Sequence, residues 1–254
     1  MGEDCGLYMS CYNGFAELYD LFMDEIDYNA WCKYIEDIFG VYGIKPARIL
    51  DTACGTGNIS IRMSKSGYNV WGLDISSDML TVAENKSRAA KHKITFLNQD
   101  MTKMSLKEKF DAVLCMCDGV NYVSDESELA DYFGLVYERL EKDGIFIFDI
   151  SSYYKLKYIL GDNTFYEEKN NKHYIWDNSF DEESDIIEMD LIFFVPQDGL
   201  YRKFNECHMQ KAYKNEHLVD LLKKASFRNI SCYDGFSFEK PDEKSERVFF
   251  AARK

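Results

Sequence analysis

Ile49-Leu50-Asp51-Thr52-Ala53-Cys54-Gly55-Thr56-Gly57-Asn58 is the stretch that decides the fold expected of this chain. An apolar run typical of a buried strand ends at Asp51, passes through a loop with two glycines, and precedes a predicted helix. Gly55 and Gly57 allow backbone angles and a close ligand approach that a side chain would block. The helix start beyond them offers free N–H groups. The stretch therefore predicts a strand, loop and helix that bind a cofactor.

The identity of that cofactor depends on the residues around the loop, because a Gly-x-Gly pair also occurs in ordinary tight turns. A second predicted strand, residues 68–73, ends at Asp74, where a carboxylate can accept hydrogen bonds from ribose hydroxyls. An acid that only caps the next helix is the alternative reading. A nicotinamide-binding loop needs a third glycine where Ser60 stands, and Asp51 would lie near its pyrophosphate. A ligand without phosphates is favoured.

The segments LDTACGTGN and YNVWGLDISSDML resemble the first two motifs of class I S-adenosylmethionine-dependent methyltransferases. The resemblance extends from about Tyr12 to the C-terminus. It implies that S-adenosyl-L-methionine is the cofactor and S-adenosyl-L-homocysteine the product. The segment YNGFAELYD also looks like the N-terminal cap of small-molecule members, including aminosugar N,N-dimethyltransferases and glycine N-methyltransferase.

Composition indicates one globular domain with an elaboration, since the 254 residues are 46% hydrophobic. No apolar run is long enough to cross a bilayer, and the start MGEDCG lacks the features of a signal peptide, so a cytoplasmic protein is expected. The eight cysteines then read as reduced thiols, and the four histidines show no metal-ligand spacing, so no metal site is expected. The net charge of −14 disfavours nucleic acid and favours a small or cationic substrate.

Alternating strand and helix patterns predict an α/β fold with a parallel sheet. Predicted strands cover residues 47–52, 68–74, 94–98, 110–116 and 144–150. Residues 165–213 show strand alternation instead, with a turn at 197–199, which predicts an antiparallel lid or dimer surface. The resemblance implies a Rossmann-like, doubly wound sheet of seven strands whose last strand is antiparallel. Four parts are expected: an N-terminal helical cap (1–45), the cofactor-binding core (46–160), the inserted β lid (161–213) and the C-terminal completion of the core (214–254).

The resemblance implies a set of cofactor contacts from the cap and from the loops that follow the first four strands. Asp74 serves the ribose, Ile75 and Met79 pack on the adenine, and Asp100 and Met101 match the position that meets the adenine amino group. The whole expected set is Tyr19, Asp51, Ala53, Gly55, Gly57, Asp74, Ile75, Met79, Asp100, Met101 and Cys117.

Three residues are candidates for the transfer itself. Tyr12 matches a cap tyrosine near the transferable methyl group, and Asn121 occupies the place where some aminosugar enzymes have a histidine. His208 lies at the centre of ECHMQKAY, which resembles a segment ExHxQRY of related small-molecule enzymes. Alternation places Glu206, His208 and Gln210 on one face of a strand, over an acceptor pocket or, in the simpler interpretation, toward solvent.

These observations predict an S-adenosylmethionine-dependent methyltransferase that transfers a methyl group in line to a nitrogen or oxygen of a small molecule. CDGVNY, residues 117–122, replaces the Asn/Asp-Pro-Pro-Tyr motif of DNA and protein-glutamine methyltransferases and argues against those substrates. An RNA or protein methyltransferase, a non-catalytic cofactor-binding regulator and a nicotinamide oxidoreductase are the alternatives. A homodimer through the β insertion is a further expectation.

Overall fold

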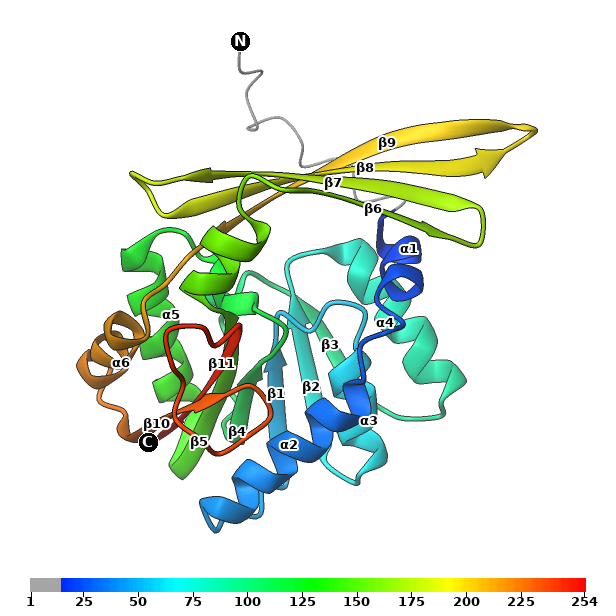
Figure 1. The fold of residues 1–254 in the computed structure, drawn as a ribbon. Helices are drawn as coiled ribbons and strands as arrows, with labels where there is room; N and C mark the ends of the chain where they lie inside the picture. Colours follow the sequence, from blue (N-terminus) through cyan, green and yellow to red (C-terminus); the bar gives the residue numbers. More distant parts are fainter. Residues whose placement is uncertain (1–14) are drawn as a thin grey trace.

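The computed structural model describes residues 15–254, and its core is a seven-stranded sheet in the order β10-β11-β5-β4-β1-β2-β3 (Figure 1). Tyr12 lies outside the described residues. The strands of this sheet are β1 (Arg48–Thr52), β2 (Asn69–Asp74), β3 (Thr95–Asn98), β4 (Phe110–Cys115), β5 (Leu140–Ser151), β10 (Arg228–Asp234) and β11 (Arg247–Arg253).

The central strands of the sheet are the ones that are apolar on both faces. In β4 and β5 nearly every residue from Ala112 and Ile145 onward is buried, as expected for central strands of a sheet covered on both sides. β1 pairs in parallel with β2 and β4, whereas β11 is antiparallel to both β5 and β10. The predicted Rossmann-like sheet with an antiparallel last strand is confirmed.

The helices form two groups. One comprises α2 (Tyr28–Val41), α3 (Asn58–Lys65) and α4 (Ser77–Ala89), and the other α5 (Glu126–Arg139) and α6 (Asn215–Lys224). Side chains fix their starts: the Ser76 hydroxyl accepts the Met79 N–H at 3.3 Å, and Asp125 accepts two N–H groups of α5. Short 3-10 turns, η2 (Met101–Lys103) and η3 (Gly119–Tyr122), follow β3 and β4. The loops at the carboxyl ends of the strands are therefore held in place.

A separate four-stranded antiparallel sheet forms a lid over the carboxyl ends of the central strands (Figure 1). Its strands are β6 (Thr164–Lys169), β7 (Lys172–Asp181), β8 (Ile186–Gln197) and β9 (Leu200–Lys211). The lid rests on α1 (Phe15–Phe22) through Phe193. It also rests on the π-helical turn η4 (Lys155–Leu160) through Ile187 and Met189. The predicted β insertion is confirmed.

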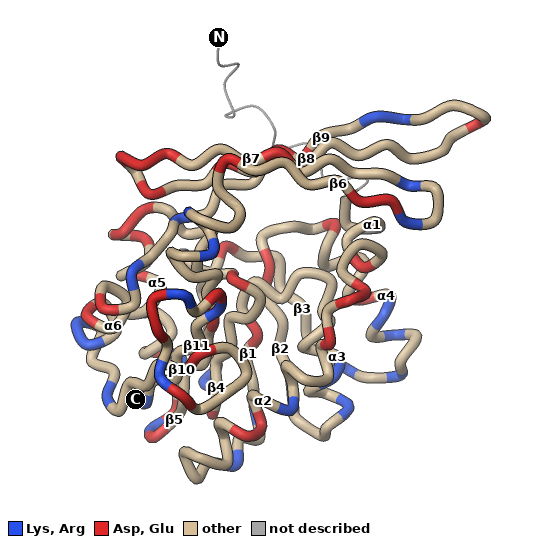
Figure 2. Tube along the Cα trace, in the orientation of Figure 1, with Lys and Arg blue, Asp and Glu red and all other residues tan. Residues whose placement is uncertain are grey.

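Acidic and basic residues are both scattered along the core and the lid (Figure 2). The described cysteines are free thiols, namely Cys32, Cys54, Cys115, Cys117, Cys207 and Cys232. Between residues 15 and 254, no helix combines the length and the apolar character that crossing a membrane requires.

Gly72 in β2 tests how tightly the cofactor loop packs on the sheet. A Cβ at this position would lie 2.7 Å from the Phe96 ring and 2.9 Å from Cys54 Sγ. We expect Gly72→Ala to lower the free energy of unfolding by about 1–3 kcal/mol, measured by denaturant titration. Gly134→Ala is the matched control, because nothing lies within 4 Å of its Cβ in α5 and alanine favours helix. Equal stability of the two variants would contradict this packing.

Candidate functional site

A cavity of about 610 Å³ lies between the carboxyl ends of the strands and the lid. Its walls come from the loops after β1, β2, β3 and β4, from α1, and from the inner face of the lid. The size suits a small organic ligand. Ten of the predicted cofactor residues line it: Tyr19, Asp51, Ala53, Gly55, Asp74, Ile75, Met79, Asp100, Met101 and Cys117.

The glycine loop takes the left-handed backbone that its sequence predicts. Gly55 has φ 52° and Gly57 has φ 75°, and Ala53 shares this conformation with φ 55°. Gly57 does not line the cavity; it begins α3, and a Cβ there would lie 3.1 Å from Ala83 Cβ in α4. Gly55 thus shapes the cavity wall, whereas Gly57 lets the two helices pack closely.

Asp74, at the end of β2, holds the glycine loop against this strand by a hydrogen bond. Its carboxylate accepts the Gly55 N–H at 2.7 Å and the Ser76 N–H at 2.9 Å, one on each oxygen. Burial raises the pKa of Asp74, and these N–H donors oppose the rise. The N-cap of α4 is Ser76, so the alternative reading of Asp74 as a helix cap does not describe it. Each carboxylate oxygen keeps a second lone pair for a ligand.

Asp51 is the most buried acid of the cavity wall, with 2% of its surface exposed. The Ser60 hydroxyl donates to its carboxylate. Burial raises the pKa of Asp51 to about 7, and the Ser60 hydrogen bond opposes this. A cation in the cavity would favour the ionised form. Ser60, at the position of the missing third glycine, therefore orients the acid.

A buried ionic network that sequence reasoning missed lies at the end of β4. Cys117 and Asp118 both have left-handed backbones, with φ 58° and 56°. The Asp149 carboxylate on β5 accepts the N–H of Cys117 at 2.7 Å and that of Asp118 at 3.2 Å. Arg247 on β11 pairs with both acids, and its nitrogen lies 2.9 Å from Asp118. The network thus holds a turn that is costly for non-glycine residues.

The same network reaches the lid, because Gln210 on β9 donates to Asp118 at 2.8 Å. Burial opposes ionisation of Asp118, but Arg247 and the hydrogen bonds outweigh it and lower the pKa. Burial raises the pKa of Asp149 to about 6 although Arg247 opposes the rise. An acid inside the apolar run of residues 145–150 was the one local signal for Asp149. Arg247 lies at the edge of an apolar strand, and its surroundings in the sequence gave no signal of this role.

Asn121 has a structural environment. It is fully buried and does not line the cavity. Its amide donates to the carbonyls of Ser151 at 3.1 Å and Lys211 at 2.9 Å and accepts the Ser151 N–H at 3.0 Å. These bonds occupy both amide hydrogens and tie β5 to the end of β9. We therefore give Asn121 a positioning role in place of the predicted catalytic one.

The polar row on β9 faces inward, so the solvent-facing interpretation of it is wrong. Glu206 and Gln210 are buried, and His208 and Gln210 line the cavity. His208 packs its ring 5.4 Å from Phe15, and its Nδ1 lies 3.5 Å from the Tyr122 hydroxyl. Burial lowers the pKa of His208 to about 4, so the imidazole is neutral at physiological pH.

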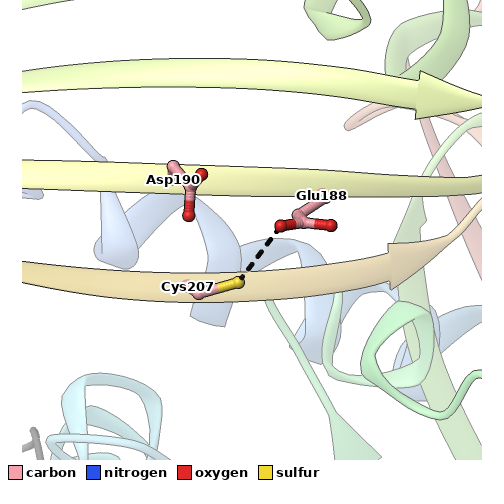
Figure 3. A group of neighbouring side chains, drawn as sticks. All are labelled: Glu188, Asp190 and Cys207. Atoms are coloured by element: carbon pink, nitrogen blue, oxygen red, sulfur yellow. Dashed lines mark hydrogen bonds between the residues drawn. The ribbon is translucent and has the colours of Figure 1, made fainter. Parts of the chain in front are cut away.

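The outer face of the lid carries a different group, formed by Glu188, Asp190 and Cys207 (Figure 3). Their ligand atoms lie within 4.8 Å of one another, and Cys207 Sγ is 3.9 Å from Glu188. Two carboxylates and a thiolate can bind a cation, but exposed acids often gather without one. Strand alternation directs this group away from the cavity.

Comparison with known proteins decides the family. A protein-family profile described as a methyltransferase domain matches residues 49–144. A methyltransferase of Geobacillus sp. (strain WCH70) is 38% identical over 96% of this chain and 99% of its own length. The chain belongs to the class I S-adenosylmethionine-dependent methyltransferases.

Two further relatives extend the comparison. The crystal structure of an S-adenosylmethionine-dependent methyltransferase from Clostridium acetobutylicum has a TM-score of 0.86 and 36% identity, covering 95% of this chain and 98% of that one. A dTDP-3-amino-3,4,6-trideoxy-alpha-D-glucopyranose N,N-dimethyltransferase of Streptomyces venezuelae is 33% identical over 52% of this chain and 55% of its own. S-adenosylmethionine is therefore the cofactor of this methyltransferase. Its cationic sulfonium and flat aromatic adenine ring suit a wall with a buried acid, Asp51, and apolar Ile75 and Met79.

Asp74→Asn should weaken the binding of S-adenosylhomocysteine by about tenfold or more in calorimetry. The neutral amide cannot accept the Gly55 and Ser76 N–H groups and ribose hydroxyls equally well. Asp78→Asn is the control, since Asp78 lies in the first turn of α4 outside the cavity wall. If Asp74→Asn folds normally and binds S-adenosylhomocysteine with unchanged affinity, Asp74 is not a cofactor ligand.

Glu206→Gln should stabilise the protein in alkaline but not in acidic solution. Burial raises the pKa of Glu206 to about 7, above its usual 4.5, so the folded state holds the proton more tightly. This stability is present below pH 4.5 and is lost as the pH rises through 7. We expect the variant to gain a Tm advantage of about 2–4 °C at pH 8 and none at pH 4. A pH-independent difference would contradict the assignment.

Proposed function

We propose that this methyltransferase transfers the methyl group to a nitrogen or oxygen of a small molecule held beneath the lid. The observation that carries the proposal is the single cavity that runs from the glycine loop to the inner face of the lid. α1 lines it beside the loop, so cofactor and acceptor would share one continuous space. The named substrate of the Streptomyces venezuelae relative, an aminosugar, supports an acceptor of this size.

S-adenosylmethionine would lie along the loops after β1, β2 and β3. Asp74 would accept from the ribose hydroxyls, Asp51 would face the cationic end, and Gly55 and Ala53 would let the backbone approach the amino-acid portion. Ile75, Met79 and Met101 would pack on the adenine, while Asp100 would meet its amino group. Tyr19 and Cys117 complete the wall at the cap and at the end of β4.

α1 holds water out of this site through a polar clamp at its C-terminal half. Asp20 accepts from Lys86 Nζ at 2.6 Å and from the Thr56 hydroxyl at 2.7 Å. The Asn58 amide donates to the same carboxylate at 2.8 Å. The clamp joins the cap, the glycine loop and α4, and so fixes the cap over the cofactor. Exclusion of water and alignment of the acceptor supply most of the catalysis that the protein must provide.

His208 receives the proton that the acceptor loses. Bound S-adenosylmethionine supplies an already activated methyl group, so the acceptor needs only an aligned lone pair. The neutral imidazole offers a lone pair at physiological pH. Tyr12, predicted as a catalytic residue near the methyl group, lies outside the described residues and stays a prediction.

The acidic cavity wall disfavours macromolecular acceptors with phosphates. Asp51, Asp74, Asp100 and Asp118 all line it, and only Asp118 pairs directly with arginine among these. An RNA or protein substrate and a regulator without turnover remain the competing functions. We also propose a cytoplasmic enzyme, with the β lid as the surface through which two copies would pair.

His208→Asn tests this function. With labelled S-adenosylmethionine and a panel of small amines, phenols and amino sugars, we expect kcat/KM to fall about 100-fold while cofactor affinity stays unchanged. His173→Asn is the matched control, because His173 lies elsewhere on the lid and does not line the cavity. Label transferred only to RNA or protein would favour a macromolecular substrate. Cofactor binding without any turnover would favour a regulator.

A further inference from the structure

Unpartnered polar atoms gather on the lid. Within residues 15–254, five buried side-chain nitrogen or oxygen atoms have no hydrogen-bond partner, and four of them belong to β7 and β9. They are Trp176 Nε1, Asn178 Oδ1, Glu206 Oε1 and His208 Nε2. Buried polar atoms without partners are rare and costly in native proteins. Four of them on one small sheet indicate a surface completed by a ligand.

The strand register places these four side chains in two neighbouring rows. Trp176 pairs across Leu191 with Glu206, and Asn178 pairs across Met189 with His208. The two rows are two residues apart along each strand and therefore share one face. Trp176, Leu191, Met189 and His208 line the cavity, so this face of the lid borders the acceptor space. Glu206 and Asn178 lie on the same face without lining the cavity themselves.

Glu206 gives the surface its chemical preference. It is 5% exposed, and no lysine or arginine salt bridge reaches it among the described residues. Burial is the cause of its raised pKa, with no charged group acting on it. A ligand hydroxyl would satisfy the free oxygen, but only a cation would also neutralise the buried charge.

We propose that Glu206 binds a protonated amino group of the acceptor, and that the Trp176 N–H donates to an oxygen of the same molecule. This inference rests on the proposed function, because it assigns the substrate class of that site. The acceptor is then a small amine that carries a hydroxyl, ether or carbonyl oxygen. The nitrogen lone pair becomes available when the ammonium gives one proton to neutral His208, two residues along the strand. The cationic ligand also agrees with the acidic wall of the cavity.

Ligand pairs that differ only in the amino group test this preference. The probes are ethanolamine against ethylene glycol, glucosamine against glucose, and tyramine against tyrosol, each titrated into protein saturated with S-adenosylhomocysteine. Tryptophan fluorescence reports binding, because Trp176 and Trp31 line the cavity. We expect at least one amine to bind about tenfold more tightly than its hydroxyl partner at pH 7.5. No preference in any pair would overturn the proposal.

Two lid variants locate the effect. Glu206→Gln keeps the shape and should abolish the preference for the amine, whereas Glu188→Gln, exposed on the outer face of the lid, should retain it (Figure 3). Trp176→Phe should weaken both members of a pair equally. An amine preference that survives in Glu206→Gln would also overturn the proposal.

Separate measurements keep this inference apart from the function on which it rests. Calorimetry with S-adenosylhomocysteine tests the cofactor site, and label transfer tests turnover. If Glu206→Gln methylates an amine acceptor as fast as the unaltered protein, the inference fails while the methyltransferase function stands. If neither binding of S-adenosylhomocysteine nor label transfer is detected, the proposed methyltransferase function itself fails.

Discussion

The ion pair that Arg247 forms with Asp118 and Asp149 is the interaction on which the site depends. All three side chains are largely withdrawn from water, and removing the arginine would leave two carboxylates without a counter-ion. Through Asp149 the pair holds the left-handed turn after β4, and through Asp118 it reaches Gln210 on the lid. One buried cation therefore joins the centre of the sheet, its antiparallel strand and the lid. The Gln210–Asp118 hydrogen bond thus ties the lid to the turn after β4.

Satisfied and unsatisfied polar groups divide the cavity into two regions. On the cofactor side, Asp51 and Asp74 already accept hydrogen bonds from the protein, which fix the loop geometry and leave lone pairs for a ligand. Beneath the lid, Glu206 and His208 carry atoms with no partner among the described residues. The protein thus builds a rigid donor site and keeps an acceptor surface that only a second molecule completes. Such a surface costs stability, which is the usual consequence of a site made for binding.

Local sequence patterns predicted most of the fold, because strand and helix periodicity and the glycine loop are short-range features. The first strand was expected at residues 47–52 and runs from Arg48 to Thr52, and the inserted sheet was recognised from alternation. β5 begins at Leu140, four residues before the expected start, because the pairing of Phe110 with Leu140 continues the strand through a polar segment. Such pairing depends on a distant strand and has no local signature.

The sequence by itself determined the methyl donor, since the loop, Asp51 and Asp74 lie within 24 consecutive residues and their spacing carries the chemistry. Ten of the eleven expected cofactor residues line one cavity. Only the tertiary structure decided the acceptor side. Asp118, Asp149, Gln210 and Arg247 come from four segments, and Asn121 proved to bond only to backbone groups. The burial and partners of such side chains arise when β5, β9 and β11 meet, so no window of sequence contains them.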